Sequence, residues 1–239
     1  MRGQPGTLPD PTRPATVVAM FGRIAPRYDL LNTLISFGLD AAWRRRAVAA
    51  AALPAGGRAL DVGTGTGALA RALVRAAPDA EVVGVDFTAP MLALARRRQP
   101  AGARLHFLLA DAQALPFPAG SFDCVTSAFV IRNVADRLAA LREQARVLRP
   151  GGRVVCLEAT WPRAPLFRPL FRAYFRYWVP VLGGLLAGSA QAYTYLPESV
   201  AQFPSPEAFA ALLREAGFTA VRYELLGLGT VALHVGVRP

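Results

Sequence analysis

The feature that most constrains this chain is an alternation of short β-branched runs and helical stretches between residues of about 53 and 160. The runs that predict strands are RALDVG, EVVGVD, RLHFLLAD, FDCVTSAFV and GRVVCLEA. Helices are predicted over ALARALVRAA, from Pro90 onward and over LAALREQARVL. Strands that alternate with helices in this way form βαβ units with right-handed crossovers. The sequence therefore predicts an α/β fold with a doubly wound, mostly parallel sheet.

Segments of different character flank this predicted core. Residues 15–52 have helical spacing, interrupted near Pro26 and Gly38, and we expect them to form a lid over a ligand. Residues 161–195 are rich in aromatic residues, Arg and Pro and predict a helical insertion that faces a substrate or a membrane. Residues 196–239 predict a helix, SPEAFAALLREAGF, capped by its first Ser and closed by its Gly, and then a hairpin.

We expect residues 15–239 to form a single domain, since 239 residues suit one large domain. Residues 1–14 are rich in Pro and Gly and lack the apolar region of a secretory signal, so a disordered tail and a cytoplasmic protein are predicted. No run of about 20 uninterrupted apolar residues predicts a membrane span.

Cys124 and Cys156 lie in apolar runs and are predicted to be buried rather than to form a disulfide or a metal site.

The net charge of +11 is carried entirely by arginine, with 27 basic residues against 16 acidic ones. Such a charge attracts phosphates, either on nucleic acid or at an anionic membrane surface. A GC-rich coding sequence would produce the same arginine usage without functional meaning. Because the arginines are scattered and no nucleic-acid module is visible, nucleic acid is not the expected partner.

A glycine loop follows the first predicted strand, in the stretch LDVGTGTG at residues 60–67. Glycines let the backbone turn sharply beside a ligand, and ligands of open α/β sheets bind at the carboxyl ends of the strands. The chain has no lysine, which excludes a phosphate-binding GK[ST] loop, and the spacing G-x-G-x-G differs from the dinucleotide pattern. Asp61 in this loop suits a ligand with an ammonium and a sulfonium, so S-adenosylmethionine fits better than NAD.

Two further acidic positions extend the predicted cofactor site. Asp86 ends the second strand, where a carboxylate can accept both hydroxyls of an adenosine ribose. Asp111 follows the third strand, where it can accept from an adenine amino group while apolar neighbours cover the ring. No cluster of Cys, His and carboxylate residues has metal spacing, so no metal is predicted.

Several longer motifs resemble the ubiquinone/menaquinone biosynthesis C-methyltransferase family over nearly the whole chain, from about Val18 to Gly236. RYDLLN with SFGLDAAW, IRNV and YTYLPES are specific to that family, whereas the glycine loop and VLRPGG occur in many methyltransferases. The resemblance implies a class I S-adenosylmethionine-dependent fold and methyl transfer to a ring carbon of a polyprenylated hydroquinone, with demethylmenaquinol giving menaquinol as the leading candidate. A methyltransferase for another lipid or a soluble small molecule, or an RNA-binding or RNA-modifying protein, is the alternative.

The resemblance also assigns cofactor contacts to Thr66, Asp86, Asp111 and Ala112. A serine that is another contact in the family aligns with Ala128, which implies that the contact is lost or moves to Ser127. The family usually has glycine where Val130 stands, and we expect this departure to reshape the substrate wall. The predicted cofactor residues are Asp61, Gly63, Thr64, Gly65, Thr66, Gly67, Asp86, Phe87, Asp111, Ala112, Ser127 and, from the lid segment, Tyr28.

Arg132 and Asn133 are the predicted catalytic residues, because they stand where the fourth strand ends, on the same sheet edge as the glycine loop. A phenol with a pKa near 10 must lose its proton before its ring carbon becomes a good nucleophile. Arginine stays protonated, but it can hold a phenolate or an ordered water by charge-assisted hydrogen bonds. Asn133 braces the arginine or orients the phenol. In the alternative, Arg132 pairs with a structural carboxylate such as Asp136 and Asn133 caps the next helix.

The segment PLFRPLFRAYFRYW places Arg168, Arg172 and Arg176 at a four-residue spacing, on one face of a helix. Phe167, Phe171, Phe175 and Trp178 are expected to form an adjoining apolar surface. A cationic face beside an aromatic one is typical of a helix that rests on anionic lipid, and a helix packed on the domain with its arginines in water is the alternative. Peripheral contact with the inner face of the cell membrane is thus expected, and a homodimer is left open.

Overall fold

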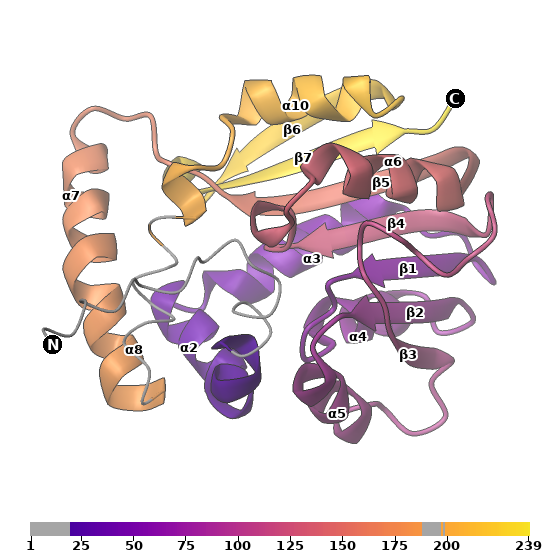
Figure 1. Ribbon diagram of the computed structural model, residues 1–239, viewed down its shortest axis with the longest axis horizontal. Coiled ribbons are helices and arrows are strands. Elements are labelled where there is room, and N and C mark those ends of the chain that lie inside the picture. The colour runs from indigo at the N-terminus through magenta and orange to yellow at the C-terminus, as the bar shows by residue number, and fades with distance from the viewer. Residues whose placement is uncertain (1–19, 188–196, 198) are drawn as a thin grey trace, which may run out of the picture.

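A seven-stranded sheet with helices on its two faces forms the described part of the molecule, residues 20–187, 197 and 199–239 of the computed structural model (Figure 1). The strand order is β3-β2-β1-β4-β5-β7-β6. The strands are β1 (Arg58–Val62), β2 (Glu81–Asp86), β3 (Leu105–Leu109), β4 (Phe122–Ala128), β5 (Leu148–Ala159), β6 (Thr219–Leu226) and β7 (Val231–Val237). The first five pair in parallel, and β7 runs antiparallel to both β5 and β6. The predicted mostly parallel sheet and terminal hairpin are confirmed.

The helices follow the predicted alternation, with two irregular turns that bear on function. They are α2 (Tyr28–Ile35), α3 (Leu39–Ala51), α4 (Ala68–Ala76), α5 (Ala89–Arg97), α6 (Arg137–Val147), α7 (Phe167–Ala173), α8 (Val179–Ala187) and α10 (Pro206–Glu215). A 3-10 turn, Ile131–Asn133, follows β4, and a π-helical turn, Tyr174–Trp178, joins α7 to α8. A further two 3-10 turns span Ala25–Arg27 and Gly227–Gly229.

Alternate residues of the strands face opposite sides of the sheet, as a period of two requires. Leu60 and Val62 of β1 belong to an apolar cluster that includes residues of α6 and α10. Ala59, which precedes Leu60 on the strand, belongs to a second cluster with residues of α3 and α4. Helices therefore cover both faces, which is the expected doubly wound arrangement. Cys124 and Cys156 are free and buried in these clusters, as predicted.

The ends of two helices show which predicted caps form. Ser205 caps α10 by accepting from the Ala208 amide, and Gly217 follows its last turn with φ +100°, as predicted. For α6 the cap is Asp136, whose carboxylate accepts from the Ala139 amide at 2.9 Å. The alternative role of Asn133 as the cap of that helix is therefore wrong. Asn133 lies before this cap, in the 3-10 turn that follows β4.

The insertion packs on the N-terminal helices instead of standing apart. α2, α7 and α8 lie together beyond the carboxyl ends of the parallel strands (Figure 1). A third cluster joins Leu31 of α2 to Phe175 and Val179, and Phe171 packs against it. The expectation that Phe171 and Phe175 belong to an outer apolar surface is therefore wrong, because these rings face the domain. Among the described residues, no helix combines the length and apolar character needed to cross a membrane.

Candidate functional site: two adjoining cavities at the carboxyl edge of the sheet

The glycine loop after β1 is held against the end of β2. The Thr64 amide donates to the Val85 carbonyl at 2.9 Å. The Gly65 amide donates to one Asp86 carboxylate oxygen at 2.8 Å, and the Thr88 amide donates to the other at 2.8 Å. These contacts fix the orientation of the Asp86 carboxylate beside the loop. Burial raises the pKa of Asp86 above its ordinary value, against the backbone hydrogen bonds that favour the carboxylate.

A cavity opens directly above this loop. It is lined by Phe21, Tyr28, Gly63, Gly65, Asp86, Phe87, Thr88, Met91, Ala110, Asp111, Ala112, Gln113, Ala128, Phe129, Val130, Asn133, Val134 and Ala135. Seven of the predicted cofactor residues belong to this lining, from Tyr28 to Ala112. We refer to this space as the cofactor cavity.

The side chains of Asp61, Thr64, Thr66 and Ser127, together with Gly67, lie outside the described lining. One Asp61 oxygen accepts from the Thr64 hydroxyl at 2.7 Å, and the other accepts from the Thr126 hydroxyl at 2.8 Å. Burial raises the pKa of Asp61 to about 6. Asp61 therefore supports the glycine loop from below, and Ser127 is fully buried, whereas Ala128 borders the cavity.

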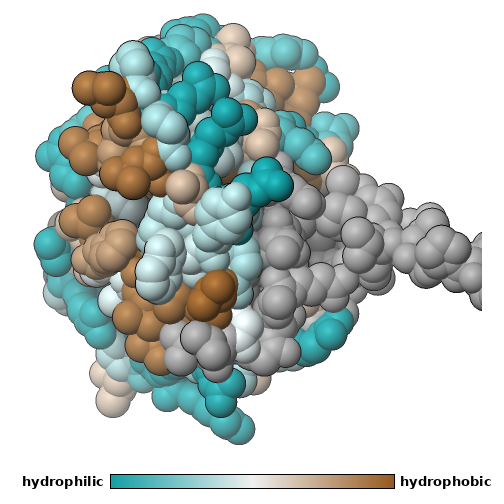
Figure 2. Space-filling view, turned by 90° about the vertical axis from the view of Figure 1, so that its left-hand side faces the viewer, coloured by the Kyte–Doolittle hydropathy of each residue, from teal (hydrophilic) through white to brown (hydrophobic). Residues whose placement is uncertain are grey.

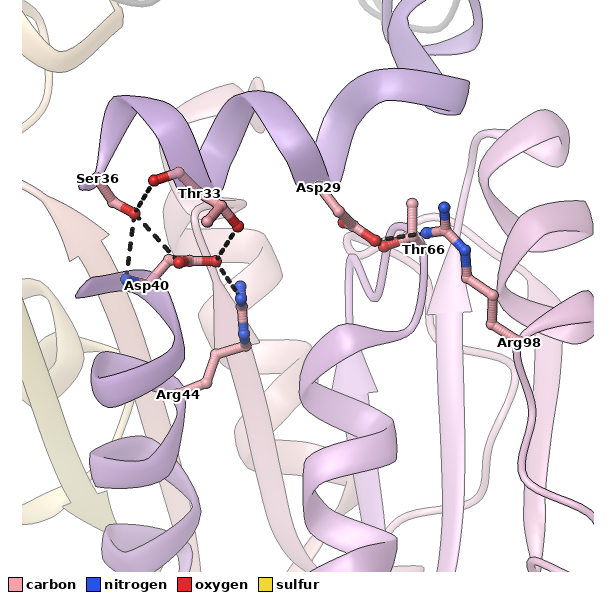
Figure 3. A network of polar contacts seen from close by, with 7 residues as sticks. All are labelled: Asp29, Thr33, Ser36, Asp40, Arg44, Thr66 and Arg98. Carbon is pink, nitrogen blue, oxygen red and sulfur yellow. Dashed lines mark hydrogen bonds and ion pairs between the residues drawn. The ribbon is translucent and has the colours of Figure 1, made fainter. Parts of the chain in front are cut away.

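Thr66 contacts the N-terminal helix. Its hydroxyl donates to Asp29 Oδ1 at 2.7 Å, and the Arg98 guanidinium, at the end of α5, donates to Asp29 Oδ2 (Figure 3). Asp29 is the neighbour of Tyr28 on α2. This helix is thus attached to the glycine loop through Asp29 while it presents Tyr28 to the cavity. Figure 3 also shows Ser36, Thr33 and Arg44 around Asp40, the contacts that fix the corner between α2 and α3.

The charges in the cofactor cavity suit S-adenosylmethionine. Asp86 and Asp111 are both in the lining, and none of the described lining residues is basic. A phosphate-bearing ligand would meet carboxylates without a compensating cation, whereas a sulfonium ligand with an adenosine group meets an acidic, partly apolar space. The arginines that give the chain its net charge of +11 therefore do not line this cavity.

Val130 acts on the cofactor cavity and not on the substrate wall that we expected it to reshape. Gly63 has φ +64°, and a Cβ atom added there would come within 2.4 Å of Val130 Cγ2. Val130 lines the cofactor cavity and is absent from the described lining of the second cavity. The valine therefore makes glycine obligatory at position 63 by contact as well as by backbone conformation.

A second, larger cavity of about 700 Å³ adjoins the first. Tyr28 and Phe129 line both cavities and therefore lie where the two cavities adjoin. Most of the remaining lining is apolar and comes from α2, α3, α7, the π turn, and the loop between β6 and β7; it includes Ile35, Trp43, Leu170, Phe171, Phe175, Trp178, Leu228 and Val231. We refer to this space as the apolar cavity.

Arg132 supplies a cationic side chain to the apolar cavity. Its Nη1 donates to Glu158 Oε2 at 3.1 Å, and the other Glu158 oxygen accepts from the Ile131 amide at 2.6 Å. The expected carboxylate partner is thus Glu158 at the end of β5 and not Asp136. Glu158 is 1% exposed and Arg132 is 9% exposed. Burial raises the pKa of Glu158, and the Arg132 charge opposes that rise.

The guanidinium of Arg132 has more N–H donors than its contact with Glu158 uses. Its Nε atom is buried and has no hydrogen-bond partner among the described residues. Because the side chain lines the apolar cavity, an acceptor bound there can be reached by the remaining Nη donors. Asn133, the next residue, donates to the Phe129 carbonyl at 3.2 Å and lines the cofactor cavity. The two predicted catalytic residues therefore face different cavities.

The sequence reasoning did not identify Phe129 and Trp43. Phe129 has φ +61°, its ring lies 5.7 Å from the Arg132 guanidinium carbon, and the Trp43 ring centroid lies 6.4 Å from its own. Phe129 stands two positions before the IRN motif, which was the available signal, but its backbone conformation cannot be predicted from residue type. Among the described residues, no three His, Cys, Asp or Glu side chains are grouped closely enough to hold a metal ion.

Comparisons with known proteins agree on one family. Residues 11–238 match the ubiE/COQ5 methyltransferase family. A demethylmenaquinone methyltransferase of Thermus thermophilus is 58% identical, covering 92% of this chain and 100% of its own. A ubiquinone/menaquinone biosynthesis C-methyltransferase of Geobacter sulfurreducens is 48% identical, covering 89% of this chain and 85% of its own.

A solved structure extends the comparison to the fold. A methyltransferase of Thermotoga maritima, described as S-adenosylmethionine-dependent, has a TM-score of 0.64 at 24% identity and covers 92% of this chain and 99% of its own. At that identity the likeness concerns the fold, which is the predicted methyltransferase type. The family motif YTYLPES lies almost entirely within residues 188–196 and 198, outside the described residues.

Proposed function

Because the chain belongs to the ubiE/COQ5 methyltransferase family, we propose that it transfers a methyl group from S-adenosylmethionine to a ring carbon of a polyprenyl hydroquinone. Demethylmenaquinol, giving menaquinol in menaquinone biosynthesis, is the substrate that the relatives support. The match with this chain covers 100% of the demethylmenaquinone methyltransferase of Thermus thermophilus and 85% of the quinone C-methyltransferase of Geobacter sulfurreducens.

One observation carries this proposal: an acidic cofactor cavity and a large apolar cavity adjoin at Tyr28 and Phe129. Methyl transfer needs the donor and the acceptor within contact distance and in line. An apolar space of about 700 Å³ accommodates part of a polyprenyl quinol, and Arg132, a buried basic residue of its lining, lies next to Phe129. A small hydrophilic substrate would leave most of this apolar lining in contact with water.

The residues of the chain activate the ring in the proposed reaction. When bound, S-adenosylmethionine supplies an electrophilic methyl group on its sulfonium. A guanidinium N–H of Arg132 donates to the quinol oxygen and stabilises the phenolate that forms when the phenol proton passes to water in the cavity, since a guanidinium does not accept the proton itself. Glu158 fixes the guanidinium from behind, and Tyr28 and Phe129 lie where the methyl donor and the ring meet. Asn133 lines the cofactor cavity, where it orients the methyl donor.

The lid, the site residues and the location of the enzyme complete the proposal. Residues 15–52 act as the lid, because α2 lines both cavities and is attached to the glycine loop through Asp29. Asp61, Thr64, Thr66, Gly67 and Ser127 act on the cofactor by shaping the loop and strand ends beneath it. Since a polyprenyl quinol is dissolved in the bilayer, the enzyme works as a cytoplasmic protein at the inner face of the membrane.

An assay with labelled S-adenosylmethionine and demethylmenaquinol tests the function. We expect the wild-type protein to label the quinol and Arg132→Ala to lose at least about a hundredfold in rate, because one stabilising donor is worth that much in a dry site. The cofactor Kd should change by less than about threefold, since Arg132 lies outside the cofactor cavity. Arg46→Ala, which removes an exposed pair with Glu224, is the matched control and should keep the wild-type rate.

Arg132→Ala leaves Glu158 buried without its partner, so the double variant Arg132→Ala/Glu158→Gln is included to separate misfolding from lost chemistry. Wild-type activity in a folded double variant contradicts the role of Arg132. Transfer to a soluble phenol but not to the quinol would favour the alternative substrate class.

A further inference from the structure

The mouth of the apolar cavity carries unusually exposed apolar side chains. Phe37 and Leu228 line the cavity, and each is 78% exposed to solvent. Four more exposed apolar or aromatic residues line the same mouth: Leu39, Leu170, Tyr177 and Trp178. They come from the α2–α3 corner, α7, the π turn and the loop between β6 and β7. We define these six residues as the rim.

The apolar surface extends outward from the rim along α7 and α8. Leu166, just before α7, is 93% exposed, and Val181 of α8 is also exposed, although neither lines the cavity. Figure 2, which views this side of the molecule, shows several groups of apolar residues among hydrophilic ones. Single exposed apolar residues are common, but a group around a cavity mouth indicates an interaction surface.

The charge beside the rim has one sign. Arg168, Arg172 and Arg176 are all exposed. The sequence has no acidic residue between Glu158 and Glu198, so this segment contains no carboxylate of its own to neutralise them. Each basic residue near an anionic bilayer adds to the electrostatic attraction, so three arginines together strengthen it.

The rim is held in a defined shape by contacts behind it. The Tyr174 hydroxyl, in the π turn, donates to the Ile35 carbonyl of α2 at 3.0 Å. Trp161 packs edge-on against Phe171 and Phe175, with ring centroids 5.8 and 5.9 Å apart. These contacts join the two sides of the cavity mouth, so the inward phenylalanines support the outward side chains. The packed and lipid-facing alternatives for this insertion are therefore compatible.

We propose that the rim, with Leu166 and Val181, inserts into the apolar layer of an anionic bilayer while the three arginines contact its headgroups. The cavity mouth then opens into lipid instead of water, and the isoprenoid chain of the quinol enters sideways without crossing an aqueous phase. This inference rests on the proposed lipid substrate for its route of entry, whereas docking itself rests only on the surface. A second copy of the chain is disfavoured as the occupant, because it would bring a second set of the same arginines.

Vesicle flotation of the full chain without quinol tests docking. We expect the wild-type protein to float at low salt with vesicles of equal parts phosphatidylglycerol and phosphatidylcholine, and not with phosphatidylcholine alone. Replacing Arg168, Arg172 and Arg176 together by Glu should weaken binding at least about tenfold. The matched control replaces Arg75, Arg97 and Arg142, three exposed arginines on other helices, by Glu and gives the same net charge.

A second pair of variants tests the apolar part of the surface. Leu166→Ser with Val181→Ser should weaken vesicle binding about tenfold, since two buried side chains each lose a large part of their transfer free energy. Leu108→Ser with Leu109→Ser changes two exposed residues of β3, at the edge of the sheet farthest from β6 and β7, and should bind as the wild-type protein does.

The activity readout separates docking from catalysis. The arginine variant should keep the wild-type kcat/KM with a short-chain, water-soluble quinol and lose at least about tenfold with a long-chain quinol embedded in anionic vesicles, because only entry from lipid requires docking. Failure of the wild-type protein to float, or equal loss in the control variants, overturns docking. A dimer that forms through the rim, detected by sedimentation, overturns it in favour of a second copy. Flotation without methylation of either quinol instead contradicts the proposed function and leaves docking supported.

Discussion

The buried Asp61 carboxylate, under the glycine loop, gives the folded protein a specific pH dependence. Burial raises its pKa from an ordinary value of 3.8 to about 6. A group with a raised pKa contributes stability that is fully present below the unfolded pKa and is lost as the pH rises through the folded one. The ionised form is thus unfavourable in the protein without cofactor at pH 7.5.

We predict that Asp61→Asn raises the free energy of unfolding at pH 7.5 by about 1 to 3 kcal/mol, with little gain at pH 4.5. The neutral amide has no charge to bury, and it can still hydrogen-bond to the Thr64 and Thr126 hydroxyls. Urea unfolding of both proteins at the two pH values measures the difference. A variant that is less stable than the wild-type protein at pH 7.5 contradicts the assignment.

Gly63 is required for two separable reasons, its positive φ and its contact with Val130. We predict that Gly63→Ala costs about 2 to 4 kcal/mol of stability, and that Val130→Gly in the same chain returns at least about 1 kcal/mol of it by removing the clash. Gly102→Ala is the control, since it has φ +72° with no atom within 4 Å of the added Cβ. Equal costs for Gly63→Ala with and without Val130, measured by urea unfolding, would show that the contact is unimportant.

The sequence predicted the positions of some site side chains but not the partners that orient them. The acid at Asp86 and the arginine at Arg132 were predicted at the strand ends, and the structure places them there. The orientation of Thr66, which points to Asp29, depends on a partner 37 positions away on another element. Residue type and spacing within the loop do not specify that partner.

At the scale of elements, α2 connects the two cavities to the glycine loop. Tyr28 lines both cavities, and Asp29 accepts from Thr66 in the loop and from Arg98 on the far side (Figure 3). The position of this helix therefore depends on the conformation of the loop. We expect cofactor binding and closure of α2 to be coupled.

We predict that Asp29→Ala raises the Kd for S-adenosylmethionine about three- to thirtyfold, because a charge-assisted hydrogen bond that orders the site is lost. Arg98→Ala should have a smaller effect, since that ion pair is partly exposed and screened by solvent. Isothermal titration calorimetry gives both values, with the exposed Asp79→Ala as control. An unchanged Kd for Asp29→Ala rules out the coupling.

Element types and sheet direction were predictable because they follow from local pattern. Each strand of the parallel core reads as an apolar run, and each crossover helix shows helical spacing. The packing of the insertion was not predictable in the same way. Whether Phe175 faces lipid or the domain depends on contacts with α2, about 140 positions earlier, and the π turn that orients these rings has no signature in the residue types.

At the scale of the whole molecule, acidic side chains and apolar side chains line two different cavities. The cofactor cavity is acidic although the chain has a net charge of +11, so the arginines lie elsewhere on the protein. The apolar cavity opens on one side, between α2, α7 and the loop before β7. This arrangement places an acidic cavity and an apolar cavity next to each other, at Tyr28 and Phe129.

The position of the transferred methyl group distinguishes C-methylation from the alternatives. With Arg132 holding the quinol oxygen beside Tyr28 and Phe129, the neighbouring ring carbon faces the methyl donor. Incubation with carbon-13 methyl S-adenosylmethionine and demethylmenaquinol in anionic vesicles, followed by NMR of the extracted quinol, locates the label. We predict a methyl group on the ring carbon, whereas an O-methyl ether, or no label in the quinol from a protein that binds the cofactor, would contradict this arrangement.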